Sequence, residues 1–471
     1  MAGVTTCNEV YENLTDRWER CRDCSIGGDA VKARGSKYLP LLDSHKEKYE
    51  KYLDYQRRAL FYNATGRTIA GLSGAIFQKA PSIETDSKVK EQATDITLAG
   101  EPLDVFALNI TKEYLITGRF GILVDMSSEP ATEPRPYWLM YRAEDIINWR
   151  FAKFGGDQEL VFAVLREYID RPKITDEFDI EQIVQYRVLR LNDGIYTQQI
   201  YIEEKSQNGS NATKYVAGPI AIPQRRGKAL DFIPFALPWG IIQPPLLDLV
   251  DVNLAHYRGS ADLKHGLHYV ALPTPWVSGL ASANKGEPLN IGAGTAWILE
   301  KDGTAGMLEF TGAGLGAIRL DLQDMQNLMA TLGARLLEQA PRYAETALSV
   351  SMRHSSDYAT LRTIAQVVEQ LLSFALKIHS WWLGTDSLVE ANPSKIELNK
   401  VFFDQSLTAD ELRALLLALQ SNSISYKTFY ARLASTGWTR EGIDNEEEAK
   451  EIANNPPEVG IKPAPAPGVV N

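Results

Sequence analysis

The sequence lacks the signals of several protein classes. It has only three cysteines, Cys7, Cys21 and Cys24. One Cys-x-x-Cys pair without a second pair or a nearby histidine is a poor structural zinc site, so we expect reduced thiols in a loose N-terminal arm. No run of about eighteen apolar residues occurs, and residues 1–19 do not resemble a signal peptide. We expect no membrane span and a cytoplasm-like compartment.

Catalytic motifs are missing as well. The patterns G-x-x-x-x-G-K-[ST], G-x-G-x-x-G, G-x-S-x-G and H-E-x-x-H do not occur, which removes the usual supports for ATP hydrolysis and for serine or zinc hydrolysis. The net charge of -11 also disfavours a protein that grips nucleic acid tightly through its phosphates. A negative wall would still suit a polymer that must slide past without sticking.

What is present is typical of an ordinary globular chain. The 471 residues are 44% hydrophobic and 23% charged, which predicts two or more packed regions. Helical spacing indicates one or two helices within 44–80 and another over 102–118, followed by a buried strand at 120–125. Residues 137–235 alternate between Val, Ile or Tyr segments and turns, so we expect strands at 160–168, 182–191 and 195–202. The fold class is α+β, predominantly helical.

The second half predicts long helices. Apolar spacing indicates a helix over 246–268, then a β-rich tip with strand-like pieces at 296–300 and 307–310. A second helix begins near Leu315, and its apolar positions form a heptad seam at Leu315, Ile318, Leu322, Met325, Met329, Leu332 and Leu336. Residues 339–356 form a polar loop, and a third helix covers 357–383. A smaller helical region opens on a capping box, Thr408 to Glu411, and the proline-rich residues 456–471 are expected to be disordered.

Several polar residues could suggest chemistry. Three histidines lie close together in the helix over 246–268, but without a carboxylate at ligand spacing they favour packing or surface roles: His256, His265 and His268. Five aspartates could be taken for a two-metal nuclease, but they lie off the apolar stripes and indicate solvated faces: Asp248, Asp251, Asp262, Asp321 and Asp324. The loop concentrates positive charge at Arg342, Arg353 and His354, either as an ordinary exposed loop or as one that touches phosphates.

The order helix, β tip, helix, loop and long helix resembles portal proteins of tailed double-stranded DNA phages. Three stretches are similar to that family: Tyr38–Leu42 with residues 55–81, Thr117–Asp125, and Tyr141–Arg150. The resemblance covers about residues 38–440. It implies a non-enzymatic, twelve-subunit ring at one capsid vertex, through which DNA is packaged and later ejected. The competing hypotheses are a metal-dependent nuclease and a minor head or scaffold protein.

The resemblance also implies an organisation along the chain. Its parts are an N-terminal arm (1–37), a wing (38–243), a stem helix (244–268), a clip (269–312), a second stem helix (313–339), a tunnel loop (340–356), a wing helix (357–392), a crown-like helical region (393–455) and a disordered tail (456–471). No metal or cofactor is implied.

Partners and sites follow from the same resemblance. The partners are double-stranded DNA in the channel, the terminase large subunit, a head-to-tail adaptor, and the major capsid protein with its scaffold. The candidate sites are a DNA-facing tunnel loop (Arg342, Arg353, His354), channel-lining residues (Asp251, Asp262, Asp321, Asp324) and a docking clip (Lys285, Glu287, Lys301, Asp302). Assembly would take place in the host cytoplasm, with the mature protein in the virion.

Overall fold

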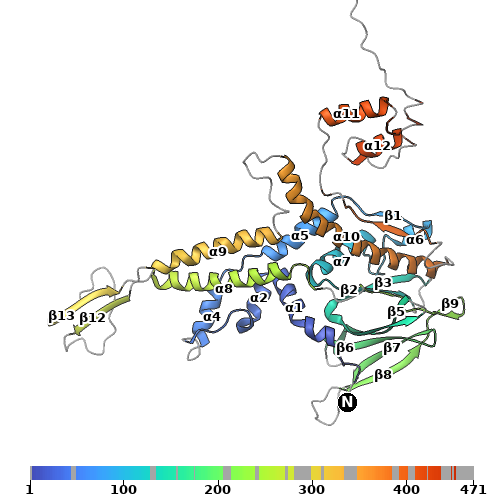
Figure 1. Cartoon of the computed structure of the whole chain (residues 1–471). Coiled ribbons are helices and arrows are strands. Elements are labelled where there is room, and N and C mark those ends of the chain that lie inside the picture. Colours follow the sequence, from blue (N-terminus) through green and yellow to red (C-terminus); the bar gives the residue numbers. More distant parts are fainter. Residues whose placement is uncertain are drawn as a thin grey trace, which may run out of the picture. The chain divides into compact units, whose positions relative to one another are not determined.

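The computed structural model describes most of the chain. It covers residues 3–43, 49–127, 134–154, 157–173, 176–204, 214–238, 243–270, 274–280, 299–308, 312–333, 347–384, 392–400, 402, 409–421, 423–435, and the single positions 447, 450, 451 and 454. Two compact units are Met1–Lys400 and Val401–Asn471. The structure is 49% helical and 30% strand, so helix and strand are mixed as expected (Figure 1). The strand share is larger than a predominantly helical fold implies.

The N-terminal segment is a packed helical layer. Its elements are α1 (Glu9–Ile26), α2 (Gly28–Ala33), the short 3-10 helix η1 (Gly35–Lys37) and α4 (Tyr49–Arg58). The side chain of Asn8 caps α1 by accepting the N–H of Val10. Trp18 is fully buried, and its indole N–H donates to the carbonyl of Thr117 at 3.0 Å. The expectation of a loose arm was therefore wrong.

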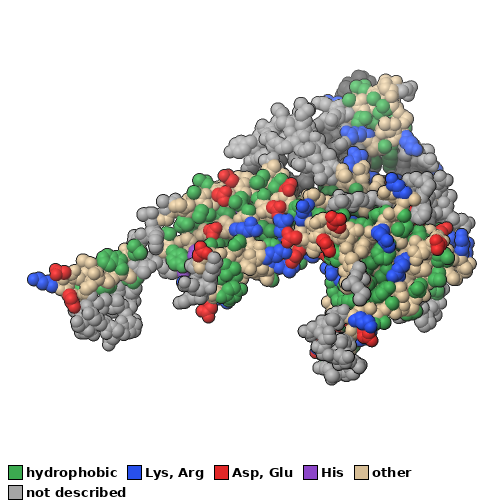
Figure 2. All heavy atoms as spheres, turned by 60° about the horizontal axis from the view of Figure 1, so that its bottom comes forward, with side chains coloured by type: hydrophobic (Ala, Val, Ile, Leu, Met, Phe, Trp, Pro, Cys, Tyr) green, Lys and Arg blue, Asp and Glu red, His purple; other side chains and the backbone are tan. Residues whose placement is uncertain are grey.

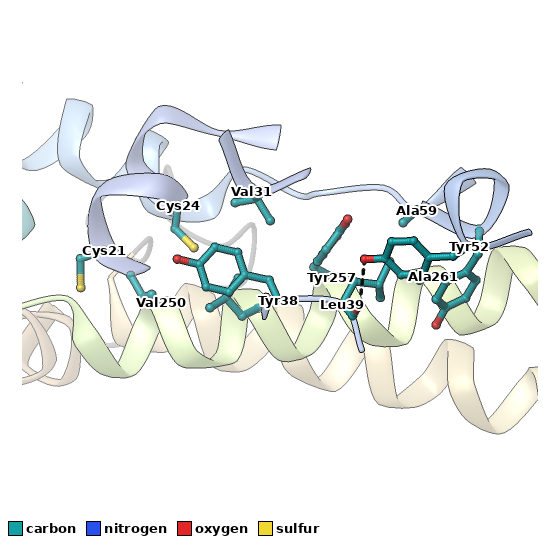
Figure 3. Packing of buried hydrophobic residues seen from close by; sticks show 12 residues of the cluster. Cys21, Cys24, Val31, Tyr38, Leu39, Tyr52, Ala59, Val250, Tyr257 and Ala261 are labelled. Carbon is teal, nitrogen blue, oxygen red and sulfur yellow. Dashed lines mark hydrogen bonds between the residues drawn. The ribbon is translucent and has the colours of Figure 1, made fainter. Parts of the chain in front are cut away.

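Two of the three cysteines, Cys21 and Cys24, are buried as well. Cys21 and Cys24 lie in the core between α1, α4 and the later helix α8 (Leu247–Val270), as Figure 3 shows. Burial raises the pKa of the Cys21 thiol to about 12 and also raises that of Cys24. Both thiols are thus protonated at neutral pH, and their role is packing.

A second group of elements joins α1 to the sheets. It consists of α5 (Ala64–Ile76), β1 (Ser82–Glu84), α6 (Ser87–Gln92), α7 (Leu103–Thr117), β2 (Phe120–Met126), β3 (Pro136–Arg142) and the 3-10 helix η2 (Ala143–Asp145). Gly118 ends α7 in the left-handed conformation, with φ 70°. Arg22 of α1 forms 2.5 Å ion pairs with Glu113 of α7 and Glu144 of η2. The expected helix at 102–118 and buried strand at 120–125 are confirmed.

The largest sheet is an antiparallel meander with the order β4-β5-β6-β7-β8. Its strands are β4 (Ile146–Phe154), β5 (Asp157–Lys173), β6 (Asp176–Asn192), β7 (Ile195–Glu204) and β8 (Lys214–Ala221). Asp193 and Gly194 turn β6 into β7 with positive φ values of 52° and 72°, as a two-residue hairpin requires. Three short strands follow: β9 (Gln224–Arg225), β10 (Lys228–Ala229) and β11 (Phe235–Ala236), the last pairing with β2.

The next elements are two helices joined by a hairpin, followed by a longer helix. They are α8, β12 (Thr274–Leu280), β13 (Leu299–Leu308), α9 (Ala313–Leu332) and α10 (Ala347–Leu383). β12 pairs with β13 in antiparallel register, and β14 (Lys395–Glu397) pairs with β1. The expected tip is present, although one continuous β13 replaces the two strand pieces. Among the described helices, none combines the length and apolarity that a membrane crossing requires.

The third long helix corrects the sequence analysis. α10 begins at Ala347, ten residues before the expected start at Asp357, so residues 347–356 are helical rather than part of a loop. The segment is polar, but it contains neither Pro nor Gly, and nothing in it stops a helix that continues from 357.

The second unit has two described helices, α11 (Ala409–Gln420) and α12 (Tyr426–Ser435). They confirm the smaller helical region expected there. Thr408 of the expected capping box and the tail 456–471 lie outside the described residues.

Candidate assembly interface

The helices α8 and α9 pack side by side along a glycine and leucine seam (Figure 1). A Cβ atom at Gly266 would lie 2.6 Å from Leu315 Cδ2, and one at Gly259 would lie 3.1 Å from Leu322 Cδ2. The two glycines are seven residues apart on α8, as are the two leucines on α9. The helices are therefore antiparallel, and two heptad-spaced leucines fit against two heptad-spaced glycines.

The same register continues along the helices. The ring nitrogen Nε2 of His256 on α8 lies 3.1 Å from the amide nitrogen Nε2 of Gln326 on α9. At the end of α9, Gly333 meets Leu249 and Thr68. The predicted seam is confirmed at Leu322 and Met329, which are 7% and 1% exposed. It weakens at Leu332, which is 38% exposed.

The opposite side of α8 is covered by the N-terminal helices. Tyr257, Val250, Leu254 and Ala261 of α8 are buried with residues of α1, α2 and α4 (Figure 3). Asn253 accepts the Thr65 hydroxyl at 2.9 Å and donates to the carbonyl of Tyr62 at 2.7 Å. α8 is therefore held on both sides within one chain.

Two of the predicted channel-lining aspartates belong to this covered side. Asp251 pairs with Arg20 of α1. Asp262 accepts a 2.6 Å hydrogen bond from the hydroxyl of Tyr55 on α4, and this bond together with burial raises the pKa of Tyr55. Both aspartates are exposed, as expected of solvated faces, but each contacts an N-terminal helix. The solvated face predicted for these two aspartates is thus turned toward α1 and α4.

The histidines of α8 take separate partners. His256 is 3% exposed and faces Gln326, and burial lowers its pKa. The ring of His265 packs edge-on against Tyr55, with ring centroids 5.2 Å apart. In the part of the chain that the structure describes, no group of three or more His, Cys, Asp or Glu side chains could hold a metal ion.

The outer side of α9 is apolar and exposed. Leu320, Leu328 and Leu332 are 65%, 47% and 38% exposed. They are spaced by multiples of four, with Asp324 between the first two, and such a row forms one ridge on a helix surface. We call these four residues the α9 ridge. Figure 2 shows hydrophobic and acidic side chains interspersed on the surface of this helical pair.

The remaining candidates divide between described and undescribed positions. Asp321 and Asp324 are exposed on α9, and Lys301 and Asp302 are exposed at the start of β13. Arg353 and His354 lie in the first turns of α10, so they are not part of a loop. Arg342, Lys285 and Glu287 fall outside the described residues.

Two features of this region were not predicted from the sequence. The α9 ridge is visible as apolar residues at positions 320 and 328, outside the heptad seam that drew attention. The β12–β13 hairpin also exposes Trp276, Met307 and Leu308, which are 45%, 51% and 51% exposed. In both places the signal in the sequence was the presence of large apolar residues that the packing of α8 against α9 does not use.

The comparisons with known proteins address this same region. Residues 245–383, from α8 to α10, match the family described as Domain of unknown function (DUF4055). The chain has no match among curated proteins.

Three solved structures were also compared. A chain from the virion of a native gene transfer agent particle shares 12% sequence identity with this chain and superposes with a TM-score of 0.34. The match covers 85% of this chain and 92% of that chain. The neck of an empty gene transfer agent particle has 12% identity and a TM-score of 0.37, covering 82% and 93%. The neck of a native particle computed with C12 symmetry has 14% identity and a TM-score of 0.33, covering 82% and 89%. Values this low assign neither fold nor role to the present chain.

Proposed function

We propose that this chain is a portal subunit of a tailed phage or phage-like particle, and that it acts as a ring-forming channel and docking protein without a substrate. The observation that carries the proposal is the α9 ridge. A helix that leaves three leucines exposed on one row is suited to pack against another helix, and repeated copies of the chain supply one. The order α8, β12–β13, α9 and α10 supports the resemblance noted in the sequence.

In this proposal the ring has twelve subunits and stands at one capsid vertex. The β12–β13 hairpin, with Lys301 and Asp302, receives the terminase during packaging and the head-to-tail adaptor afterwards. Residues 340–356, with Arg342, Arg353 and His354, contact the DNA. The capsid protein and its scaffold surround the ring, which assembles in the host cytoplasm and remains in the virion.

Of the two helices, α9 is the better candidate for the proposed channel wall. Asp321 and Asp324 are exposed and can give an opening its negative character. Asp251 and Asp262 are weaker candidates because Arg20 and Tyr55 bind them within the chain. Asp324 lies on the α9 ridge itself, so it would stand at the border between subunit contact and opening.

The test compares assembly of the wild type with a Leu320→Asp, Leu328→Asp variant. The wild type should form rings in negative-stain images and high-mass species in mass photometry. The variant should remain monomeric, and its melting temperature should equal that of the unassembled wild-type chain, since its two changes lie on exposed positions. An Arg319→Asp variant controls for added negative charge on α9. Rings in the double variant, or a wild type that is monomeric under every assembly condition, would contradict the proposal.

A further inference from the structure

The hairpin of β5 and β6 extends well beyond its sheet. β4 pairs with β5 only up to Leu165, and β7 pairs with β6 only from Gln185 onward. The remaining parts, 168–173 of β5 and 176–184 of β6, pair with each other as a two-stranded ribbon. We call this segment the β5–β6 ribbon. A two-stranded hairpin alone is at best marginally stable in water, so a ribbon of this length indicates a partner.

The ribbon also carries apolar side chains in water. Phe178 is 88% exposed and Ile180 is 62% exposed, while Tyr168 and Ile169 are 49% and 41% exposed. Burying the Phe178 side chain against a partner would remove roughly 150 Å² of apolar surface from water. An apolar recess is the natural site for such a side chain.

A recess of this kind exists in the same unit. A groove of about 570 Å³ lies between the start of β5, the segment before β11, and α10. Its walls include Phe151, Leu160, Phe232, Leu371 and Phe374. Phe374 is 39% exposed, so the groove opens to the surface. We call it the α10 groove.

The ribbon and the groove lie at opposite ends of one strand. β5 begins at the groove, with Gln158, Glu159 and Leu160 in the wall, and ends in the ribbon. A strand of 17 residues spans roughly 50 Å. The ribbon of a chain is therefore directed away from its own groove and can reach only the groove of another chain.

The charges of the two surfaces are complementary. Between residues 168 and 182 the ribbon has five carboxylates and two cations. Beside the groove, the β9–β10 turn carries Arg225, Arg226 and Lys228; Arg225 lies 4.4 Å above the ring of Trp381, which itself contacts Phe232 of the groove wall. Glu159 in the wall and nearby Asp231 offer partners to Arg171 of the ribbon, whose Lys173 already pairs with Asp179 at 2.5 Å. Burial and Asp231 both raise the pKa of Glu159, so a neighbouring cation would favour its ionised form.

We propose that the β5–β6 ribbon of one copy binds in the α10 groove of the next copy, with Phe178 as the anchor. This inference rests on the proposed ring and names a contact within it. Two different surfaces on opposite sides of a subunit make a head-to-tail contact, which closes into a ring when the rotation between copies permits.

Cross-linking of mixed full-length variants tests the contact. One variant carries Ile180→Cys on the ribbon and the other Gln370→Cys in the groove wall, so that Phe178 and Phe374 stay in place. Both carry Cys7→Ser, because Cys21 and Cys24 are buried. A short bismaleimide cross-linker should join the two variants into a covalent dimer, while either variant alone should stay uncoupled. The control replaces Ile180→Cys with Ile220→Cys, an equally exposed position on β8, and should give no dimer.

A second measurement uses association. Phe178→Asp should weaken self-association in mass photometry at least tenfold without changing the melting temperature, and Ile220→Asp should leave it unchanged. Association that persists without cross-linking and without an effect of Phe178→Asp would overturn this inference but not the ring. An intrachain cross-link in a diluted chain carrying both Ile180→Cys and Gln370→Cys would also overturn it, since the ribbon would then reach its own groove. A wild type that never associates overturns both proposals.

Discussion

The helices α8 and α9 are neighbours of similar length, yet they differ in how much of their surface their own chain covers. α8 buries eight residues: Leu249, Val250, Asn253, Leu254, His256, Tyr257, Ser260 and Ala261. Within the described part of α9, only Leu322 and Met329 are buried to the same degree. α8 is thus completed by the monomer, whereas α9 presents one finished face and one that is apolar and exposed. The difference indicates which helix is built for contact with another copy.

The largest expected effect is a difference in stability between substitutions at two adjacent residues of α9. Met329 is 1% exposed and Leu328 is 47% exposed. Met329→Asp should destabilise the monomer by about 4 kcal/mol or more, because it removes a buried side chain and places a charge in its position. Leu328→Asp should change monomer stability by less than about 0.5 kcal/mol. Urea unfolding of both variants measures the difference, and equal losses would remove the distinction between the two faces.

A smaller effect is expected from glycines on the two helices. Ala at Gly266 would meet Leu315, whereas Gly316 on α9 has nothing within 4 Å of its would-be Cβ. Gly316→Ala should stabilise the chain by about 0.5–1 kcal/mol through helix propensity. In Gly266→Ala the clash with Leu315 should outweigh the gain in helix propensity. This variant should be roughly 1–3 kcal/mol less stable than Gly316→Ala.

Thermal unfolding of the two alanine variants in parallel provides the comparison. Equal melting temperatures would mean that the seam adjusts to an added methyl group, and that the close approach of the helices is not set by the glycines.

The smallest effect is a pH dependence of the seam. Burial lowers the pKa of His256 below its ordinary value of about 6.5. The unfolded chain therefore takes up a proton at higher pH than the folded chain, and stability falls as the pH drops below about 6.5 toward the lowered pKa. Gln326 and the ring of Tyr62 face this histidine and carry no compensating charge.

Urea midpoints of the wild type and His256→Gln at about pH 7 and pH 5 give the measurement. The wild type should lose more stability than the variant on acidification. Burial also lowers the pKa of His379, to about 4, but that contribution is present in both proteins and cancels in the difference. Parallel losses would show that His256 remains neutral or becomes solvated at low pH.

The parts that the sequence predicted well are those with strong local signals. Apolar spacing placed α8, the heptad seam placed α9, and the alternation of Val, Ile or Tyr segments with turns placed β6 and β7. Each depends on residues within a few positions of one another. The exposure of the helix aspartates followed from the same periodicity.

The failures have two physical causes. The N-terminal segment was expected to be a loose arm, although Tyr11, Leu14, Trp18 and Cys21 recur at steps of three and four and mark the buried face of α1. The partners of Asp251 and Asp262 could not be predicted, because Arg20 and Tyr55 come from helices more than two hundred residues away in the sequence. Local periodicity gives the face of a helix but not the element that covers it.

The seam of Gly259 and Gly266 against Leu322 and Leu315 has a mechanical consequence. For α8 to slide along α9, both leucines would have to leave their positions over the glycines at the same time. The pair therefore behaves as a single stiff rod, about 36 Å long for the 24 residues of α8. A force applied at β12–β13, between the two helices in the chain, would reach α1 and α4 through Arg20 and Tyr55 rather than be absorbed by slippage along the way.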